Sequence, residues 1–302
     1  MERYAIVANV RGPWQEAIAW LKTVATREIT WLKEYATPGT PRPFQPLSQS
    51  SPAEHITLYE KFSAASDYLL PRDAELLQST LWHWDLHASN IFVTEDKITA
   101  VIDWQDCWVG PLMLQARRPP LVDFKGKRML QFPDHYKSLD AGPEKDKIRD
   151  TVERSILLFI YESELHGTSP VFGRLSHVPH VSMIKETVLF SANTWDNGII
   201  PFRESLIRIQ KHWSEICPDH PCPFTFTADE LEKHAVESEG YDENAEFWSS
   251  ISGLVARDGF VLVEDYEEAF ELFAGLREEG LRVFVGRERE DFEKATGWAV
   301  PV

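Results

Sequence analysis

Cysteine is scarce in this 302-residue sequence, which contains only Cys107, Cys217 and Cys222. So small and odd a set excludes a disulfide framework and is typical of a reducing compartment. The sequence also lacks any apolar run near the ~18 residues that a transmembrane helix needs. Its first residues show none of the charged, apolar and small-residue pattern of a secretory signal. We therefore expect a soluble, cytoplasmic protein that does not enter a membrane.

Positive charge is the second shortage: 31 Lys and Arg face 48 Asp and Glu, which gives a formal net charge of −17. This balance opposes nonspecific binding to nucleic-acid phosphates, and it gives modest support to a cationic small molecule such as an amine. Apolar residues are plentiful, because hydrophobic residues make up 43% of the chain and 11 residues are tryptophan. A sizeable buried core is therefore expected, with a small molecule rather than a nucleic acid as ligand.

The most informative segment lies between positions 81 and 104. Residues 91–93 and 98–102 are apolar and rich in β-branched side chains, and the polar residues 94–97 separate them. This pattern predicts a short antiparallel hairpin. Asp85 and Asn90 precede its first strand and Asp103 follows its second, so strand pairing would bring positions that are 18 residues apart into proximity.

The oxygen-bearing side chains of Asp85, Asn90 and Asp103 suit phosphoryl transfer. Magnesium prefers oxygen ligands and keeps several waters, so one carboxylate, one amide oxygen and the phosphates of a nucleotide are enough to hold it. Asp85 would remain free to act as a base.

The segment from His83 to Asn90, with the Ile-Asp-Trp of 102–104, resembles the H-x-D-L-H-x-x-N and I-D-W elements of the aminoglycoside phosphotransferase family of kinase-like enzymes. Residues 111–118 and 222–226 are similar to the fungal branch of that family, which includes altered inheritance of mitochondria proteins. The resemblance implies transfer from ATP or another nucleoside triphosphate, with Mg²⁺, to a small-molecule hydroxyl. A mitochondrial location is suggested by the resemblance alone, since the N-terminal helix carries acidic residues and is a poor transit peptide.

Carried over by position, the resemblance makes Asp85 the residue that orients or deprotonates the acceptor hydroxyl. Asn90 and Asp103 would hold magnesium against the nucleotide phosphates. His87 would position the loop or a substrate, whereas His83 is expected to be an architectural residue that hydrogen-bonds to the backbone. A zinc cluster of His83, Asp85 and His87 is a rival interpretation, which we disfavour because no further metal-binding motif follows.

A second zinc hypothesis involves His212, Cys217, His220 and Cys222, but their spacing is irregular and a proline-stiffened loop explains the segment better. Arg117 and Arg118 could meet an anionic acceptor or a phosphate, although the favoured interpretation is that they are solvated or salt-bridged to acidic neighbours.

The expected fold is α+β and mainly α: a helical C-lobe of the protein-kinase type with a small hairpin that carries the catalytic and metal-binding loops. Positions 14–35 have apolar residues at helical spacing after Pro13, and no glycine-rich strand and turn precede His83. We therefore predict one domain over 1–302, with 1–12 as the remnant of an absent N-lobe and 37–53 as a Pro- and Ser-rich loop.

The remainder is predicted to be helical, with apolar stripes that face the core. A capping box at 227–230 should start one helix, and Gly280 should end another before a strand or buried tail at 281–285. The stripes comprise Ile148, Val152, Ile156 and Phe159; Phe202, Leu206, Ile209 and Trp213; and Tyr266, Phe270, Phe273 and Leu276.

Two functions are consistent with these residues. One is a small-molecule phosphotransferase, which the family resemblance favours. The other is a noncatalytic, pseudokinase-type binding module, because without a glycine-rich loop and its lysine the nucleotide phosphates would lose charge-assisted contacts of about 1.5–3 kcal/mol each.

Overall fold

The computed structural model describes residues 12–37, 51–105, 107–192, 194–256 and 260–299. Helices dominate, and the strands form two separate two-stranded antiparallel sheets, β1 with β4 and β2 with β3. This confirms the predicted mainly α, kinase-like α+β class. None of the described helices combines the length and the apolar character needed to cross a lipid bilayer.

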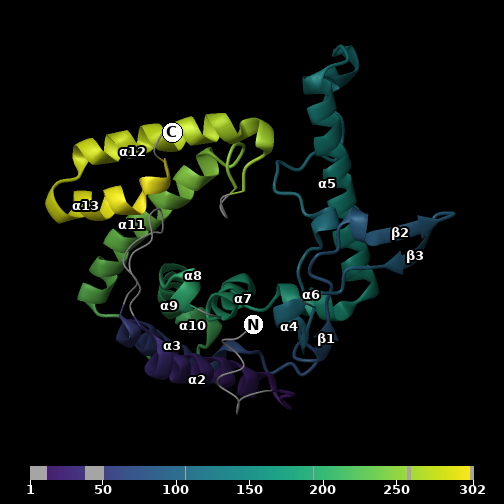
Figure 1. The fold of residues 1–302 in the computed structure, drawn as a ribbon. Helices are drawn as coiled ribbons and strands as arrows, with labels where there is room; N and C mark the ends of the chain where they lie inside the picture. The colour runs from purple at the N-terminus through teal and green to yellow at the C-terminus, as the bar shows by residue number, and fades with distance from the viewer. Residues whose placement is uncertain (1–11, 38–50, 106, 193, 257–259, 300–302) are drawn as a thin grey trace.

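The longer helices fall into an N-terminal pair, a central group and a C-terminal group (Figure 1). Their bounds are α2 (Ala17–Tyr35), α3 (Pro52–Leu69), α5 (Pro143–Thr168), α6 (Pro170–Ser176), α7 (Val181–Phe190), α9 (Ile200–Lys211), α11 (Ala228–Ser250), α12 (Tyr266–Val283) and α13 (Gly286–Ala295).

Short helices and strands connect these groups. They are β1 (Ser79–Leu81), η1 (Ala88–Asn90), β2 (Ile91–Thr94), β3 (Lys97–Val101), β4 (Val109–Pro111), α4 (Leu112–Gln115), η2 (Pro120–Val122), η3 (Asp134–Ser138), α8 (Thr194–Asn197), α10 (Trp213–Ile216), η4 (Val263–Asp265) and η5 (Gly297–Ala299).

The main core is built where α2 and α3 pack together and α9 packs on α3 and α7. Fully buried side chains from three helices meet there, among them Leu21, Phe62 and Phe202. The predicted stripe of α9 is confirmed, since Phe202, Leu206 and Ile209 are all fully buried. Helix α2 begins at Ala17 rather than directly after Pro13.

The expected loop at 37–53 is described only at its ends, because residues 38–50 lie outside the described residues. Its last two positions are already helical: Pro52 occupies the first turn of α3, where its missing N–H costs nothing. The proposed remnant at 1–12 lies outside the described residues except for Gly12.

A second, smaller core lies in the C-terminal part, where α11, α12, α13 and η5 meet. Its buried members are Val255, Ala269, Phe273 and Ala299. Helix α11 joins this core to the main one, since it also packs on α9. The capping box at its start is confirmed: Glu230 N donates to Thr227 Oγ1 at 3.2 Å and Thr227 N donates to Glu230 Oε2 at 2.7 Å.

Three expectations for the C-terminal half are wrong. Gly280 does not end α12, which continues to Val283 where a strand or tail was predicted. The ring of Phe292 in α13 lies where a side chain at position 280 would be, so the glycine permits close packing of the two helices. Helix α5 buries Val152 and Leu158, whereas Ile156 and Phe159 are exposed. Tyr266 at the start of α12 is also exposed.

Tyr59 provides a test of the main core. Its buried hydroxyl donates to Ser191 O at 2.8 Å and lies 3.1 Å from Thr194 Oγ1. We expect Tyr59→Phe to lower the free energy of unfolding by about 1–2 kcal/mol, because buried polar partners lose a hydrogen bond. Urea denaturation measures the change, and Tyr266→Phe on the exposed surface is the matched control; equal stability of the two variants would contradict the account.

Candidate functional site

The loop from His83 to Asn90 is shaped by its own backbone. Between β1 and β2, His87 N donates to Asp85 O and Asn90 N donates to His87 O, each at 3.0 Å. The second of these bonds helps to close the single turn of η1. The two consecutive turns place Asp85, His87 and Asn90 on one short, tightly wound segment.

Asn90 is the buried centre of this segment, with 5% of its surface exposed. Its Nδ2 donates to Asp85 O at 2.9 Å and lies 3.2 Å from His87 Nε2. Both contacts use the amide nitrogen, so the Oδ1 atom is left without a protein partner among the described residues. That oxygen is therefore available as an acceptor or a metal ligand.

Asp85 and His87 face each other across the turn, with Asp85 Oδ2 3.5 Å from His87 Nε2. The Asp85 side chain is 64% exposed and that of His87 is 39% exposed. A neutral His87 can accept a hydrogen bond from Asn90 at Nε2, whereas a protonated His87 would pair with Asp85. His87 thus links the exposed carboxylate to the buried amide.

The hairpin brings Asp103 back to this loop. β2 and β3 pair in the register Ile91 with Val101, and Ile102 N donates to Asn90 O at 3.0 Å. Asp103, the next residue, is exposed and has a left-handed backbone with φ 63°. Such a conformation is uncommon for a residue other than glycine, and it clusters at functional sites.

Three of the predicted hairpin boundaries shift by one residue, and the turn is tighter than expected. Glu95 and Asp96 alone connect the strands, with φ of 51° and 61°. Positive φ at both positions is the geometry of the two-residue hairpin turn whose twist matches that of its strands. The hairpin projects from the molecule beside α5 (Figure 1).

His83 has the architectural role that the sequence predicted. Its Nε2 lies 2.9 Å from Ile102 O, and its ring packs edge-on against Trp104 at 4.7 Å between centroids. The residue is buried, and its Nδ1 has no hydrogen-bond partner among the described residues. His83 thereby joins the start of the loop to the end of the hairpin.

Gln115 is a supporting residue that the sequence did not reveal. It is fully buried in α4, where its Oε1 accepts from Trp84 Nε1 at 2.5 Å and its Nε2 donates to Trp108 O at 2.7 Å. One amide thus fixes both the residue before Asp85 and the segment after Asp103. Only the fold brings position 115 between them, so no spacing rule could have found it.

The two arginines of the following segment have different partners. Arg117 lies over the Trp84 ring at 3.3 Å from its centroid. Arg118 pairs with Glu162 at 2.7 Å, as predicted, and Arg128 pairs with the same carboxylate at 2.8 Å. The Arg128 and Arg118 guanidiniums lower the pKa of Glu162.

Lys185 of α7 lies near Arg117, and its Nζ donates to Ala116 O at 2.6 Å. Burial, and secondarily the nearby charge of Arg117, lowers its pKa from 10.5 to about 8. Trp84, the residue before Asp85, thus packs against the Arg117 guanidinium, and Lys185 lies near that cation.

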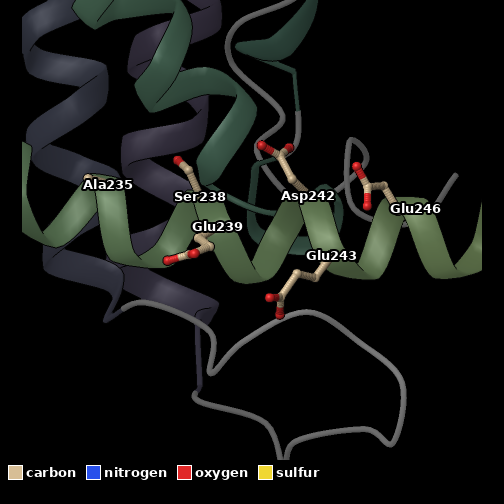
Figure 2. Close-up of a pocket in the computed structure, with 6 residues that line it drawn as sticks. All are labelled: Ala235, Ser238, Glu239, Asp242, Glu243 and Glu246. Carbon is tan, nitrogen blue, oxygen red and sulfur yellow. The ribbon is translucent and has the colours of Figure 1, made fainter.

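An open hollow of about 510 Å³ lies elsewhere, along α11. Figure 2 shows its carboxylates along one helix, contributed by Glu239, Asp242, Glu243 and Glu246. Asp85, Asn90 and Asp103 do not line it. The geometry of the loop and hairpin, rather than the presence of a hollow, identifies the candidate site.

The residues of the loop and hairpin fit a magnesium nucleotide. Two exposed carboxylates and one amide oxygen are oxygen donors, and the exposure of both carboxylates leaves room for the waters that Mg²⁺ retains. The Ile102–Asn90 backbone bond joins the two segments that carry Asn90 and Asp103.

Comparison with known proteins includes the loop and hairpin in a family match. Residues 17–114, which include the loop and the hairpin, match the model of the phosphotransferase enzyme family. The resemblance predicted from the sequence is thus confirmed for this region. No solved structure matches the chain.

Curated relatives are fungal. A subtelomeric hrmA-associated cluster protein of Aspergillus fumigatus is 25% identical over 290 residues, which cover 91% of this chain and 55% of the relative. The altered inheritance of mitochondria protein 9 of Yarrowia lipolytica, named as mitochondrial, is 24% identical over 249 residues, 78% of this chain and 42% of that protein. The chain therefore spans about half the length of the curated relatives it matches.

Gln115 provides a test of how the site is held. We expect Gln115→Leu to lower the free energy of unfolding by about 2 kcal/mol or more, because the buried Trp84 N–H and Trp108 carbonyl both lose their partner. Urea unfolding followed by tryptophan fluorescence measures this. Gln131→Leu, at an exposed position, is the control. If Gln115→Leu lowers the free energy of unfolding no more than the control does, the two hydrogen bonds of Gln115 do not stabilise the fold.

Lys185 predicts a pH dependence. Its folded pKa of about 8 lies below the unfolded value of 10.5, so the unfolded chain binds the extra proton between these values and stability rises with pH across this window. The penalty of the buried charge is fully present below pH 8. Relative to Lys185→Met, the native protein should gain stability from pH 8 to pH 10.5 in urea unfolding. Relative to the surface variant Lys147→Met, the native protein should show no such gain in stability with pH. If the stability difference between the native protein and Lys185→Met does not change with pH, the account of a buried charge is wrong.

Proposed function

We propose that this chain, whose residues 17–114 match the phosphotransferase enzyme family, binds a magnesium nucleoside triphosphate, most simply ATP, and phosphorylates a small-molecule hydroxyl. The observation that carries the proposal is the junction of the loop and the hairpin. There Asn90 and Asp103 are linked through the Ile102 N–H, and the exposed Asp85 carboxylate lies on the same turn.

Asn90 and Asp103 would hold the metal. The Asn90 Nδ2 is already occupied by Asp85 O and His87, so its Oδ1 is the atom presented to a ligand. Asp103 directly follows the hairpin with a left-handed backbone, and its exposed carboxylate would be the second ligand. Bound magnesium would supply charge stabilisation to the phosphates.

Asp85 would act on the acceptor. Its carboxylate accepts the proton of the hydroxyl while the acceptor oxygen forms a bond to the terminal phosphorus and the bond to the nucleoside diphosphate breaks. His87, 3.5 Å from Asp85 Oδ2, would orient this carboxylate or contact the substrate. The net charge of −17 favours a cationic acceptor, such as an amine-bearing alcohol, over an anionic one.

For the location within the cell, we propose the cytoplasm. Altered inheritance of mitochondria protein 9 of two yeasts is named as mitochondrial, so the mitochondrion is the alternative that the relatives suggest.

Two aspartate variants separate nucleotide binding from chemistry. Asparagine tolerates a left-handed backbone, so Asp103→Asn removes the charge without forcing a new conformation, and it should weaken magnesium-dependent nucleotide binding about tenfold or more. Asp85→Asn should leave that binding intact and lower the transfer rate about 10²–10⁴-fold. Calorimetry and a phosphate-transfer assay over a panel of amino alcohols are the measurements.

The matched control is Asp140→Asn, an exposed aspartate outside the loop and hairpin, which should change neither quantity. If the native chain binds no magnesium nucleotide at millimolar concentration, the proposal is wrong. If nucleotide binds but Asp85→Asn changes nothing, the chain is a noncatalytic binding module.

A further inference from the structure

Three side chains that commonly bind metals meet outside the loop of Asp85. His180 precedes α7, His212 separates α9 from α10, and Glu215 lies within α10. One ligand atom from each lies within 4.8 Å of the others. Within the described ranges, no second group of three such side chains comes together.

The carboxylate of Glu215 lies between the two imidazoles. Its Oε2 is 2.9 Å from His180 Nε2 and its Oε1 is 3.0 Å from His212 Nδ1. The two rings are themselves near each other, with centroids 4.5 Å apart and an interplanar angle of 36°. Each histidine thus directs a ring nitrogen toward the same small volume.

The separations suit a small metal ion. Zinc–nitrogen and zinc–oxygen bonds of about 2.0–2.1 Å in a tetrahedron place ligand atoms about 3.3 Å apart. The observed contacts of 2.9 and 3.0 Å are close to this value, so a modest outward movement of the carboxylate would admit an ion.

The backbone supports the arrangement. His180 adopts a left-handed conformation, φ 52° and ψ 31°, which a residue with a side chain rarely takes. His212 is the N-cap residue at the start of α10 and Glu215 follows three residues later, so both side chains lie on the same face of that helical turn. The hydrogen bonds from His212 and His180 lower the pKa of Glu215, which keeps the carboxylate ionised.

The cluster is also reachable from solvent. Its side chains are 24%, 31% and 61% exposed for His180, His212 and Glu215. Two imidazoles and one carboxylate leave a fourth position for water, as in three-ligand zinc sites.

We propose that His180, His212 and Glu215 form a zinc-binding site that ties the start of α7 to the junction of α9 and α10. The proposal differs from the zinc hypothesis that the sequence raised, of which it keeps only His212. His220 instead packs against Tyr68 with the rings tilted and their centroids 5.1 Å apart, and Cys217 and Cys222 pack against the main core.

The test uses the purified chain, stripped of metal by a chelator and titrated with Zn²⁺ against a chromophoric competitor. We expect one equivalent to bind with micromolar or tighter affinity and to raise the melting temperature. Co²⁺ in place of zinc should give the visible absorption of a nitrogen- and oxygen-ligated ion.

His180→Asn is the main variant, because asparagine tolerates the left-handed backbone; it should weaken Zn²⁺ binding at least tenfold. Glu215→Gln, at a mostly exposed position, should do the same and guards against misfolding of the first variant. His177→Asn, three residues from His180 and exposed, is the matched control and should bind like the native chain.

Zn²⁺ affinity that is equal in all four proteins, or absent in the native one, would overturn the proposal and leave a hydrogen-bonded histidine–glutamate cluster. Asp103→Asn should not change the zinc affinity, so failure of the zinc site and failure of the nucleotide site can be told apart.

Discussion

The peptide groups on either side of Ile102 hold the candidate site together. The N–H of Ile102 donates to the carbonyl of Asn90, and its carbonyl accepts from the buried ring of His83. One residue at the end of the hairpin is therefore joined to both ends of the loop that carries Asp85. Together with the pairing of Ile91 with Val101 in the hairpin, these two bonds join the chain at Asp103 to the loop.

Buried amide and aromatic groups extend this support. Gln115 ties Trp84 to Trp108, and Trp84 carries the guanidinium of Arg117 on its ring. The exposed residues proposed to meet substrate thus lie on a layer of packed side chains, in which Gln115 hydrogen-bonds to both tryptophan residues. Such a layer keeps functional groups fixed while leaving them accessible.

The sequence predicted what depends on local patterns and missed what depends on distant contacts. The hairpin, the capping box at Thr227 and the core face of α9 follow from β-branched runs, capping chemistry and helical periodicity. The bridge through Gln115 could not be predicted, because it joins positions that meet only after folding. Gly280 misled the prediction because glycine can end a helix or admit a neighbouring ring, and only the position of Phe292 decides between them.

The small core at the C-terminal end has a dynamic consequence. Four buried residues hold it, against the much larger set around α3 and α9. Fewer apolar contacts mean a lower free energy of local opening. Helices α12 and α13 could therefore open and close again while the helices that support Asp85 remain folded. The molecule would then unfold in two steps, the C-terminal helices at a lower denaturant concentration than the main core.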